Sequence, residues 1–590
     1  MASLTYDSLC KELYRQIYQR LERREDDRLR FAPRGTSSSV LHQDNLKLVY
    51  QCVAPSLHIA TRNALAEEDF LQRVNERSLQ RFLAILIFAG CSIDALVKFT
   101  SRLAANDVWL ERNGGRSAYR LPLELSVLDA LFRDDDDDVD DNINAYKFYT
   151  TQACFCPLVI RSREEMRIEF PERYRLPYME EQQRAEGSFG KVYEVKVAKG
   201  HFLDSWTTSA PSINAEAINV ARKDYVITPE TRVKREREIM EIIFRSSSRS
   251  ENVLESLGAL EIGDSKYCLF MPLAICDLRA YMMENHTAAP NTDEAKANYI
   301  RCAEGLAGGL SFLHEGIDTP ELDKLVCYHM DLKPENILLF QENGRWVWKL
   351  SDFGMSCVKK RRRVDQYGEV EKDFTRWFVR RRKPDPEPSI DPTRNNRGEG
   401  TYLAPESTMQ DARMAKSSDV WSLGCVISVL FAYLDDGKDG VLAYHALRRQ
   451  HRQSDGYDRF FLTNGFLPNS VHPSIEKHHD KLIKNAKSRS SREAKAVEFM
   501  LNKLESSVLK IEQDKRISAA DLKAHLQTTF QILKQPEGPG YTPGSNKTSH
   551  MGIRKRVGSL LRKVNPRKRQ VGFSRACYDS NHRVDYRLTI

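Results

Sequence analysis

Residues 328–339 of the chain read Tyr-His-Met-Asp-Leu-Lys-Pro-Glu-Asn-Ile-Leu-Leu, and this stretch decides the fold. It is followed by Lys-Leu-Ser-Asp-Phe-Gly at residues 349–354 and by Gly-Thr-Tyr-Leu-Ala-Pro-Glu at residues 400–406. Each segment sets an acidic residue in a short polar stretch beside apolar residues. Loop capping would explain Asp331 and Asp352 one at a time, but not three such segments in this order.

A glycine-containing segment lies upstream, between two predicted strands, and reads Ala-Glu-Gly-Ser-Phe-Gly-Lys-Val at residues 185–192. Gly187 and Gly190 would let backbone N–H groups approach phosphate oxygens where a side chain would obstruct them. By itself this is weak evidence, since a hairpin turn uses the same residues. Lys223 can neutralise phosphate charge, and Glu236 lies in a helical pattern that can turn toward it. Taken alone, these two would equally fit a solvated surface pair.

Together the motifs resemble those of eukaryotic protein kinases of the serine/threonine type, and they occur in the order of that family. The resemblance implies an α+β fold with two lobes, a strand-rich N-lobe and a helical C-lobe. The residue pattern agrees, because short β-branched runs follow residue 180 and long helical patterns follow residue 290. We predict a protein kinase domain over residues 178–530. The overall layout is also similar to kinases of filamentous fungi.

The resemblance implies that the site uses ATP and Mg²⁺ and transfers the γ-phosphoryl group to a protein hydroxyl. The expected catalytic residues are Asp331, which accepts the proton of that hydroxyl, and Lys333, which lies near the γ-phosphate. Oxygen atoms of Asn336 and Asp352 hold the metal, as a hard cation requires. Lys333 is typical of serine/threonine kinases, so Ser or Thr is the expected acceptor. The nucleotide is expected to contact Gly187, Gly190, Val192, Lys223 and Glu236, with Glu236 positioning Lys223.

Three residues depart from the family pattern. Ala185 replaces the first glycine of the phosphate loop and should only stiffen it. Met330 replaces the arginine that usually precedes the catalytic aspartate and receives an activating phosphate. Glu399 replaces a threonine that often contacts the catalytic residues. Met330 and Glu399 motivate an alternative prediction, a nucleotide-binding pseudokinase scaffold that acts through its helical extension and basic tail.

Two further residues resemble structural residues of the family. Arg516 is similar to the arginine that pairs with Glu406, and Asp419 is similar to the aspartate that supports the catalytic loop. We expect both to hold the C-lobe together, and neither to be catalytic.

Residues 1–170 are predicted to be a helical extension of unknown function. Two apolar sets recur at helical spacing, Leu9, Leu13, Ile17 and Leu21, and Leu79, Phe82, Leu83, Leu86 and Ile87. The apolar run Phe82–Cys91 is too short to span a bilayer and is predicted to be a buried helix. The acidic run at residues 134–138 is predicted to be a solvated loop.

Residues 535–590 are predicted to be a linker followed by a basic tail. The net charge of the chain is +8, and residues 551–590 contain eleven Lys or Arg and two Asp, so the positive charge belongs to the tail. Its apolar residues fit an amphipathic basic helix that would lie on an anionic membrane surface or in a partner groove. Its two basic clusters, Lys555-Arg556 and residues 567–569, are ten residues apart and fit a bipartite signal for a nuclear import receptor. A disordered, solvated tail is the third interpretation.

The composition, with 41% hydrophobic and 29% charged residues, is typical of a soluble globular protein. Twelve cysteines without Cys-x-x-Cys pairs indicate reduced thiols. We therefore expect an intracellular protein, in the cytoplasm, the nucleus or both. The expected partners are protein substrates, and no specific nucleic-acid binding is expected.

Overall fold

The computed structural model describes residues 5–105, 121–133, 143–187, 190–203, 216–226, 233–318, 324–360, 372–373, 400–408, 414–450, 458–464 and 467–535. All of these belong to one compact unit, Met1–Pro536. The acidic run at 134–138, Glu399 and the basic tail lie outside the described residues, so the predictions made for them stay predictions.

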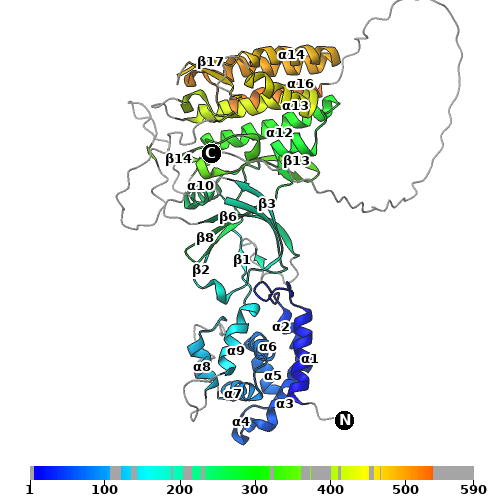
Figure 1. The fold of residues 1–590 in the computed structure, drawn as a ribbon, viewed down its shortest axis with the longest axis vertical. Helices are drawn as coiled ribbons and strands as arrows, with labels where there is room; N and C mark the ends of the chain where they lie inside the picture. The colour runs from blue at the N-terminus through cyan, green and yellow to red at the C-terminus, as the bar shows by residue number, and fades with distance from the viewer. Residues whose placement is uncertain are drawn as a thin grey trace, which may run out of the picture. The chain divides into compact units, whose positions relative to one another are not determined.

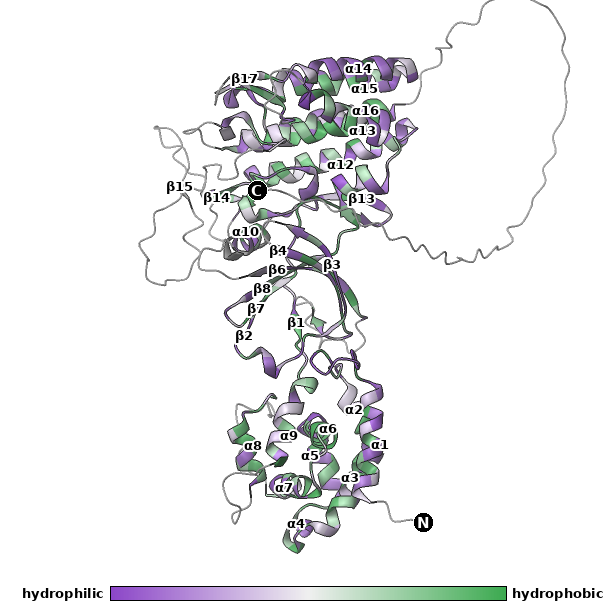
Figure 2. Ribbon diagram, viewed as in Figure 1, coloured by the Kyte–Doolittle hydropathy of each residue, from purple (hydrophilic) through white to green (hydrophobic). Residues whose placement is uncertain are grey.

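The N-terminal part is a group of helices around one apolar core. Leu9, Leu13 and Ile17 lie buried on one face of the first helix, as their spacing predicts. The sixth helix is buried from Phe82 to Phe88, and Figure 2 shows it as strongly hydrophobic. The predicted helical character of this part is confirmed. The helices are α1 (Tyr6–Gln19), α2 (Thr36–Val40), α3 (Gln43–Val53), α4 (Ile59–Ala64), α5 (Glu67–Glu76), α6 (Gln80–Phe88), α7 (Ile93–Ala104), α8 (Leu125–Phe132) and α9 (Ile143–Gln152).

A six-stranded sheet follows, in the order β2-β7-β8-β6-β4-β3 (Figure 1). Its strands are β2 (Glu165–Ile168), β3 (Tyr178–Gly187), β4 (Gly190–Val197), β6 (Ile218–Val226), β7 (Gly258–Ile262) and β8 (Lys266–Pro272). All neighbours are antiparallel except β2 and β7, which run parallel. Strand β2 lies within the region assigned to the helical extension from sequence. The sheet thus includes a strand from before residue 170. The sequence did not predict this strand, because β2 is too short to show a strand pattern of its own.

Both faces of this sheet are buried, because successive side chains of a strand point to opposite faces. On one face, Ala221 and Tyr225 of β6 pack in the core that includes α10 (Val233–Arg245). On the other face, Val220 packs with Leu158 and Ile168 from the segment before β3. A two-residue pair, β1 (Ile160–Arg161) and β5 (Phe202–Leu203), closes that segment onto the sheet.

The C-terminal part is mainly helical and shares the core of α10. Its helices are α11 (Leu278–Ala280), α12 (Asp293–Ser311), α13 (Lys416–Arg449), α14 (Ser474–Arg489), α15 (Ser491–Lys503) and α16 (Ala519–Lys534). Its short strands are β9 (Cys276–Asp277), β10 (Ile317–Asp318), β11 (Lys324–Tyr328), β12 (Ile337–Glu342), β13 (Arg345–Leu350), β14 (Cys357–Lys360), β15 (Lys372–Asp373), β16 (Phe461–Asn464) and β17 (Leu467–Val471). From the sheet onward, the strands therefore come first and the helices later, which is the order predicted for a two-lobed α+β fold.

Helix α13 is long and apolar enough, by length and composition, to cross a membrane. However, 94% of its most apolar stretch is buried inside the protein, which is the pattern of a core helix. The helix is interrupted at Asp436 and Gly437. Gly437 has φ +57°, and a Cβ atom there would lie 2.2 Å from the carbonyl oxygen of Thr287. Glycine is therefore required where the helix turns past this neighbouring loop.

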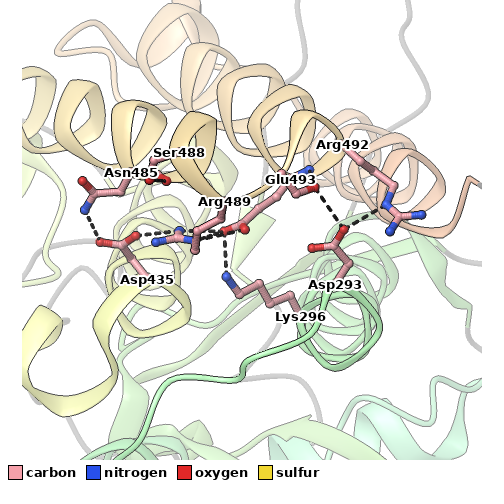
Figure 3. Close-up of polar contacts among 9 residues, drawn as sticks. Asp293, Lys296, Asp435, Asn485, Ser488, Arg489, Arg492 and Glu493 are labelled. Carbon is pink, nitrogen blue, oxygen red and sulfur yellow. Dashed lines mark hydrogen bonds and ion pairs between the residues drawn. The ribbon is translucent and has the colours of Figure 1, made fainter. Parts of the chain in front are cut away.

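A buried ionic cluster joins α12, α13, α14 and α15, as Figure 3 shows. Lys296 of α12 lies 2.7 Å from Glu493 of α15, and Arg489 of α14 lies 2.6 Å from the same carboxylate and 2.7 Å from Asp435 of α13. Asn485 donates a further hydrogen bond to Asp435 at 2.8 Å. Burial opposes ionisation of Glu493, but hydrogen bonds from Arg489 and Lys296 outweigh it and hold the pKa of Glu493 below its usual value.

Candidate active site

Lys223 lies at the centre of a buried network that joins the sheet to the C-terminal part. Its Nζ atom is 3.0 Å from Oε2 of Glu236 on α10 and 3.1 Å from Oδ1 of Asp352, which follows β13. Lys223 is 8% exposed and Glu236 is 2% exposed. The structure therefore brings Glu236 to Lys223, as the helical pattern predicts, and adds Asp352 to the pair.

Lys223 and Asp352 hold their charges against the cost of burial, whereas burial raises the pKa of Glu236. Burial disfavours the charged form of Lys223, but the carboxylates of Glu236 and Asp352 outweigh it and raise the pKa of the ammonium group. Burial likewise opposes ionisation of Asp352, yet the Lys223 ammonium holds the pKa of that carboxyl below its usual value. Lys223 is thus a fixed cation, suited to binding an anionic group such as a phosphate.

Asp331, Lys333 and Asn336 lie together in the loop between β11 and β12. The amide nitrogen of Asn336 donates to Oδ2 of Asp331 at 2.7 Å and to the carbonyl oxygen of the same residue at 2.8 Å. The Nζ atom of Lys333 lies 3.4 Å from Oδ2 of Asp331. Asp331 is 4% exposed, whereas the side chain of Lys333 is 33% exposed. The loop therefore presents an oriented carboxylate beside an accessible cation.

Asp419 of α13 fixes the backbone of this loop. Its carboxylate accepts hydrogen bonds from the backbone N–H groups of His329 and Met330, both at 2.8 Å. It also lies 3.0 Å from Nε2 of His314. Met330 has φ +65°, a conformation that costs free energy in a residue other than glycine and persists only where neighbours impose it. The predicted supporting role of Asp419 is confirmed.

The segment that carries Asp352 is tied to the same loop through His329. The ring Nε2 of His329 donates to the carbonyl oxygen of Ser351 at 2.9 Å, and the hydroxyl of Ser356 donates to the carbonyl oxygen of His329 at 3.0 Å. Asp352 itself has φ +62°. Asp331 and Asp352 are thereby held in one connected hydrogen-bonded unit.

Gly187 and Gly190 face each other across the hairpin of β3 and β4, whose tip lies outside the described residues. Gly190 has φ +149°, and a Cβ atom there would lie 2.3 Å from the carbonyl oxygen of Asp224. Packing alone therefore requires glycine at 190. Val192 pairs in register with Lys223 on the neighbouring strand. The hairpin thus places Gly190 and Val192 on the strand next to Lys223, and Gly187 on the strand beyond it.

Met330 lies in a small apolar cluster with Val326, Tyr328, Cys357 and Met414. The uncharged side chain is packed where the family has an arginine. The Nζ atom of Lys359 lies 5.4 Å from the ring centre of Tyr328 in this cluster. Lys359 is therefore a cation close to the position that Met330 leaves uncharged.

Glu406 and Arg516 form the buried ion pair that the sequence predicts. The guanidinium makes two parallel hydrogen bonds to the carboxylate, each 2.8 Å long. It also lies 5.0 Å from the ring centre of Trp421 on α13. A bidentate pair of this kind fixes the segment around Glu406 to the C-terminal helices.

The two predicted metal ligands fit a hard cation by their chemistry. The side-chain amide nitrogen of Asn336 donates a hydrogen bond to Asp331, so the side-chain carbonyl oxygen is the atom available as a metal ligand. The side chain of Asp352 is 27% exposed and carries a carboxylate. One amide oxygen and one carboxylate suit Mg²⁺, which keeps phosphate oxygens and water as its remaining ligands.

One residue of the network was missed from sequence. The hydroxyl of Tyr225, two residues after Lys223 on β6, contacts the Glu236 carboxylate. The signal was present, because residues two apart on a strand share a face. Tyrosine is so common on strands that the residue type alone did not point to this role.

Comparison with known proteins agrees with this geometry. Residues 207–527, more than half of the chain, match the protein kinase domain model. The chain is 27% identical over 230 residues to a calcium and calcium/calmodulin-dependent serine/threonine-protein kinase of Lilium longiflorum, covering 39% of this chain and 31% of the relative. It is 25% identical over 258 residues to CBL-interacting protein kinase 28 of Oryza sativa subsp. japonica, covering 43% and 45%.

A third relative, cyclin-dependent kinase G-1 of Oryza sativa subsp. indica, is 24% identical over 373 residues, covering 61% of this chain and 43% of the relative. The chain thus spans less than half the length of these relatives. The domain match, the two-lobed fold and the connected Lys223, Asp331 and Asp352 lead to one conclusion. The chain belongs to the protein kinase family.

Proposed function

We propose that the chain is an active serine/threonine protein kinase that transfers the γ-phosphoryl group of ATP to protein hydroxyls. The observation that carries this proposal is the Lys223 ammonium, held within 3.1 Å of both Glu236 and Asp352. A fixed cation beside a metal-binding carboxylate is what phosphoryl transfer needs, because this reaction relies on alignment and countercharge.

Each residue of the site has one task in this proposal. Lys223 binds the α- and β-phosphates of ATP and is positioned by Glu236. Asn336 and Asp352 would hold Mg²⁺, which supplies countercharge to the phosphates when bound. Asp331 accepts the proton of the substrate hydroxyl, and its hydrogen bond from Asn336 keeps the carboxylate oriented.

Lys333 supports serine or threonine as the acceptor. Its ammonium lies beside the Asp331 carboxylate and is accessible to a bound phosphate. One of the relatives is named a serine/threonine-protein kinase, which agrees with this acceptor class. We further propose that the protein acts inside the cell, on protein substrates.

Transfer of radiolabelled phosphate from ATP tests the proposal. The purified full chain is expected to label itself or a generic basic protein on Ser or Thr, and Asp331→Asn is expected to abolish the label. Binding of ATP with Mg²⁺ is measured in parallel. If the wild type binds nucleotide without transferring phosphate, the proposal is overturned in favour of the pseudokinase scaffold. Of the two departures that motivate this scaffold, Met330 lies within the described residues and Glu399 does not.

A further inference from the structure

A cavity of about 440 Å³ lies between the loop after α1 and the sheet face away from Lys223. Arg23, Arg28 and Leu29 line it from the loop, and Tyr178 of β3 lines it from the sheet. Its volume is within the range of about 300 to 1,000 Å³ that small-molecule sites occupy. The active-site residues described above do not line it.

The floor of the cavity is apolar. Leu158, Ile168 and Tyr178 line it and are all less than 9% exposed, and they belong to the apolar core on this face of the sheet. Leu29, at the loop, is 44% exposed, which is unusual for a large apolar side chain. The cavity therefore offers apolar surface to the body of a ligand, from the buried floor to an exposed leucine.

The charges around the cavity are unbalanced toward positive. Both acidic residues that line it are already paired, Glu181 with Arg222 at 2.8 Å and Glu172 with Arg173 at 3.8 Å. By contrast, within the described part of the chain, Arg28 and Arg175 have no carboxylate within ion-pair distance. Two arginines at one cavity thus have no direct ion-pair partner among the described residues.

Arg175 is half-buried at the cavity, and Arg28 is exposed there. The Nη1 atom of Arg175 donates to two carbonyl oxygens, those of Tyr174 at 3.0 Å and Glu172 at 3.3 Å. Burial lowers the pKa of Arg175, and the nearby carboxylate of Asp26 offsets part of this effect. Two guanidinium groups at one cavity favour a ligand that brings oxygen atoms and negative charge.

We infer that this cavity is a binding site for a small carboxylic acid with an apolar body. The carboxylate would pair with Arg28 and Arg175, and the apolar body would cover Leu29, Leu158 and Ile168. A single apolar tail with one anionic end matches both the lining and the charge. The site goes beyond the proposed kinase activity and does not depend on it.

Residues that line this cavity contact a residue of β6, the strand that carries Lys223. Glu181 of β3 pairs with Arg222, whose guanidinium also lies 5.0 Å from the ring centre of Tyr178. Arg222 precedes Lys223 on β6, and the two side chains lie on opposite faces of the same strand. Tyr178, Glu181 and Arg222 thus connect the lining of the cavity to the strand that carries Lys223.

Isothermal titration of the full chain with decanoate and with neutral decanol tests the inference, in the absence of nucleotide. Decanoate is expected to bind the wild type at least about tenfold more tightly than decanol, because only the acid can pair with the arginines. Arg28→Gln and Arg175→Gln are each expected to weaken the binding of decanoate by about tenfold and to leave the affinity for decanol unchanged. Leu29→Trp, which fills the mouth of the cavity, is expected to weaken the binding of both compounds.

Arg24→Gln is the matched control, because Arg24 is an exposed arginine of the same loop that does not line the cavity. It is expected to bind decanoate as the wild type does. Arg28 is also exposed, so Arg28→Gln keeps the test valid if Arg175→Gln fails to fold. The inference is overturned if decanoate does not bind, if decanol binds equally well, or if Arg28→Gln binds decanoate as Arg24→Gln does. None of these results bears on phosphoryl transfer.

Discussion

The hydroxyl group of Tyr225 on β6 donates a hydrogen bond to the carboxylate of Glu236 on α10. Both residues are buried, Tyr225 at 3% and Glu236 at 2% exposure. Glu236 therefore receives hydrogen bonds from Tyr225 and from Lys223. Tyr225 acts on the reaction only through Glu236, which makes it a positioning residue.

Tyr225→Phe is predicted to lower kcat/KM for ATP by about three- to tenfold, since one hydrogen bond to a charged group contributes about 1 kcal/mol or more. The protein should fold normally, because the ring stays in the core. Tyr193→Phe removes a hydroxyl from the same sheet outside this network and is expected to have wild-type kinetics. Equal kinetics for both variants would show that Glu236 is held without Tyr225.

Asp331→Asn is predicted to reduce phosphoryl transfer by about a hundredfold or more, because the amide cannot accept the substrate proton. Binding of ATP with Mg²⁺ should change little, because Lys223 and Asp352 hold the nucleotide and metal. Fluorescent-nucleotide titration beside the transfer assay separates the two effects. Lys223→Met provides the contrast, with a loss of nucleotide binding as well as of transfer. Wild-type transfer by Asp331→Asn would refute the role assigned to Asp331.

Activity is predicted to be independent of phosphorylation in the activation segment, the residues between Asp352 and Glu406. The side chain of Met330 packs in an apolar cluster and gives a phosphate no charge-assisted hydrogen bond. Phosphatase treatment should leave the transfer rate within about threefold, a barrier change below about 0.7 kcal/mol. A hundredfold loss would contradict this and would point to Lys359 as the phosphate receptor, which Lys359→Met would then test.

The contact of His201 with the helical part is predicted to weaken in acid. The Nδ1–H of His201 donates to the carbonyl oxygen of Leu158 at 2.7 Å, and its Nε2 accepts from the N–H of Arg34 at 2.9 Å. This arrangement requires the neutral ring, and burial lowers the pKa of His201. Below about pH 6.5 the unfolded chain therefore binds a proton that the folded protein does not.

The contribution of His201 to the free energy of unfolding is thus complete above about pH 6.5. Below this pH it falls by at most about 1.4 kcal/mol per pH unit, until the folded protein also takes the proton. Urea unfolding across this range measures the change, and His201→Gln, which cannot titrate, is the reference. The difference in free energy of unfolding between the two proteins should shrink as the pH falls. A difference that stays constant with pH would contradict the prediction.

Glu493→Gln is predicted to lower the free energy of unfolding by about 3 kcal/mol, because it leaves the buried ammonium of Lys296 without its carboxylate. Glu498→Gln is the control, because Glu498 forms an exposed ion pair with Lys487 and should cost less than about 1 kcal/mol. Replacing both charges, Lys296→Met with Glu493→Leu, should recover much of the loss. Equal effects of the two single substitutions, measured by urea unfolding, would contradict a buried role for the cluster.

The sequence by itself determined the parts of the site that are local. Asp331, Lys333 and Asn336 lie within six residues, so one loop brings them together, and their spacing predicted it. The helical faces of Leu9, Leu13 and Ile17 were equally predictable, because a helix repeats its contacts every three or four residues. The resemblance to the protein kinases then predicted the pairing of Arg516 with Glu406 across the C-terminal part.

Only the tertiary structure decided contacts between distant segments that carry no motif. Tyr225 reaches Glu236 because β6 and α10 share a core, and β2 joins the sheet because the segment before β3 folds over its second face. Arg28 and Arg175 meet at one cavity although they are far apart in the chain. Hydrophobic burial is non-directional and rewards many pairings alike, so a sequence pattern tells which face is buried but not what covers it.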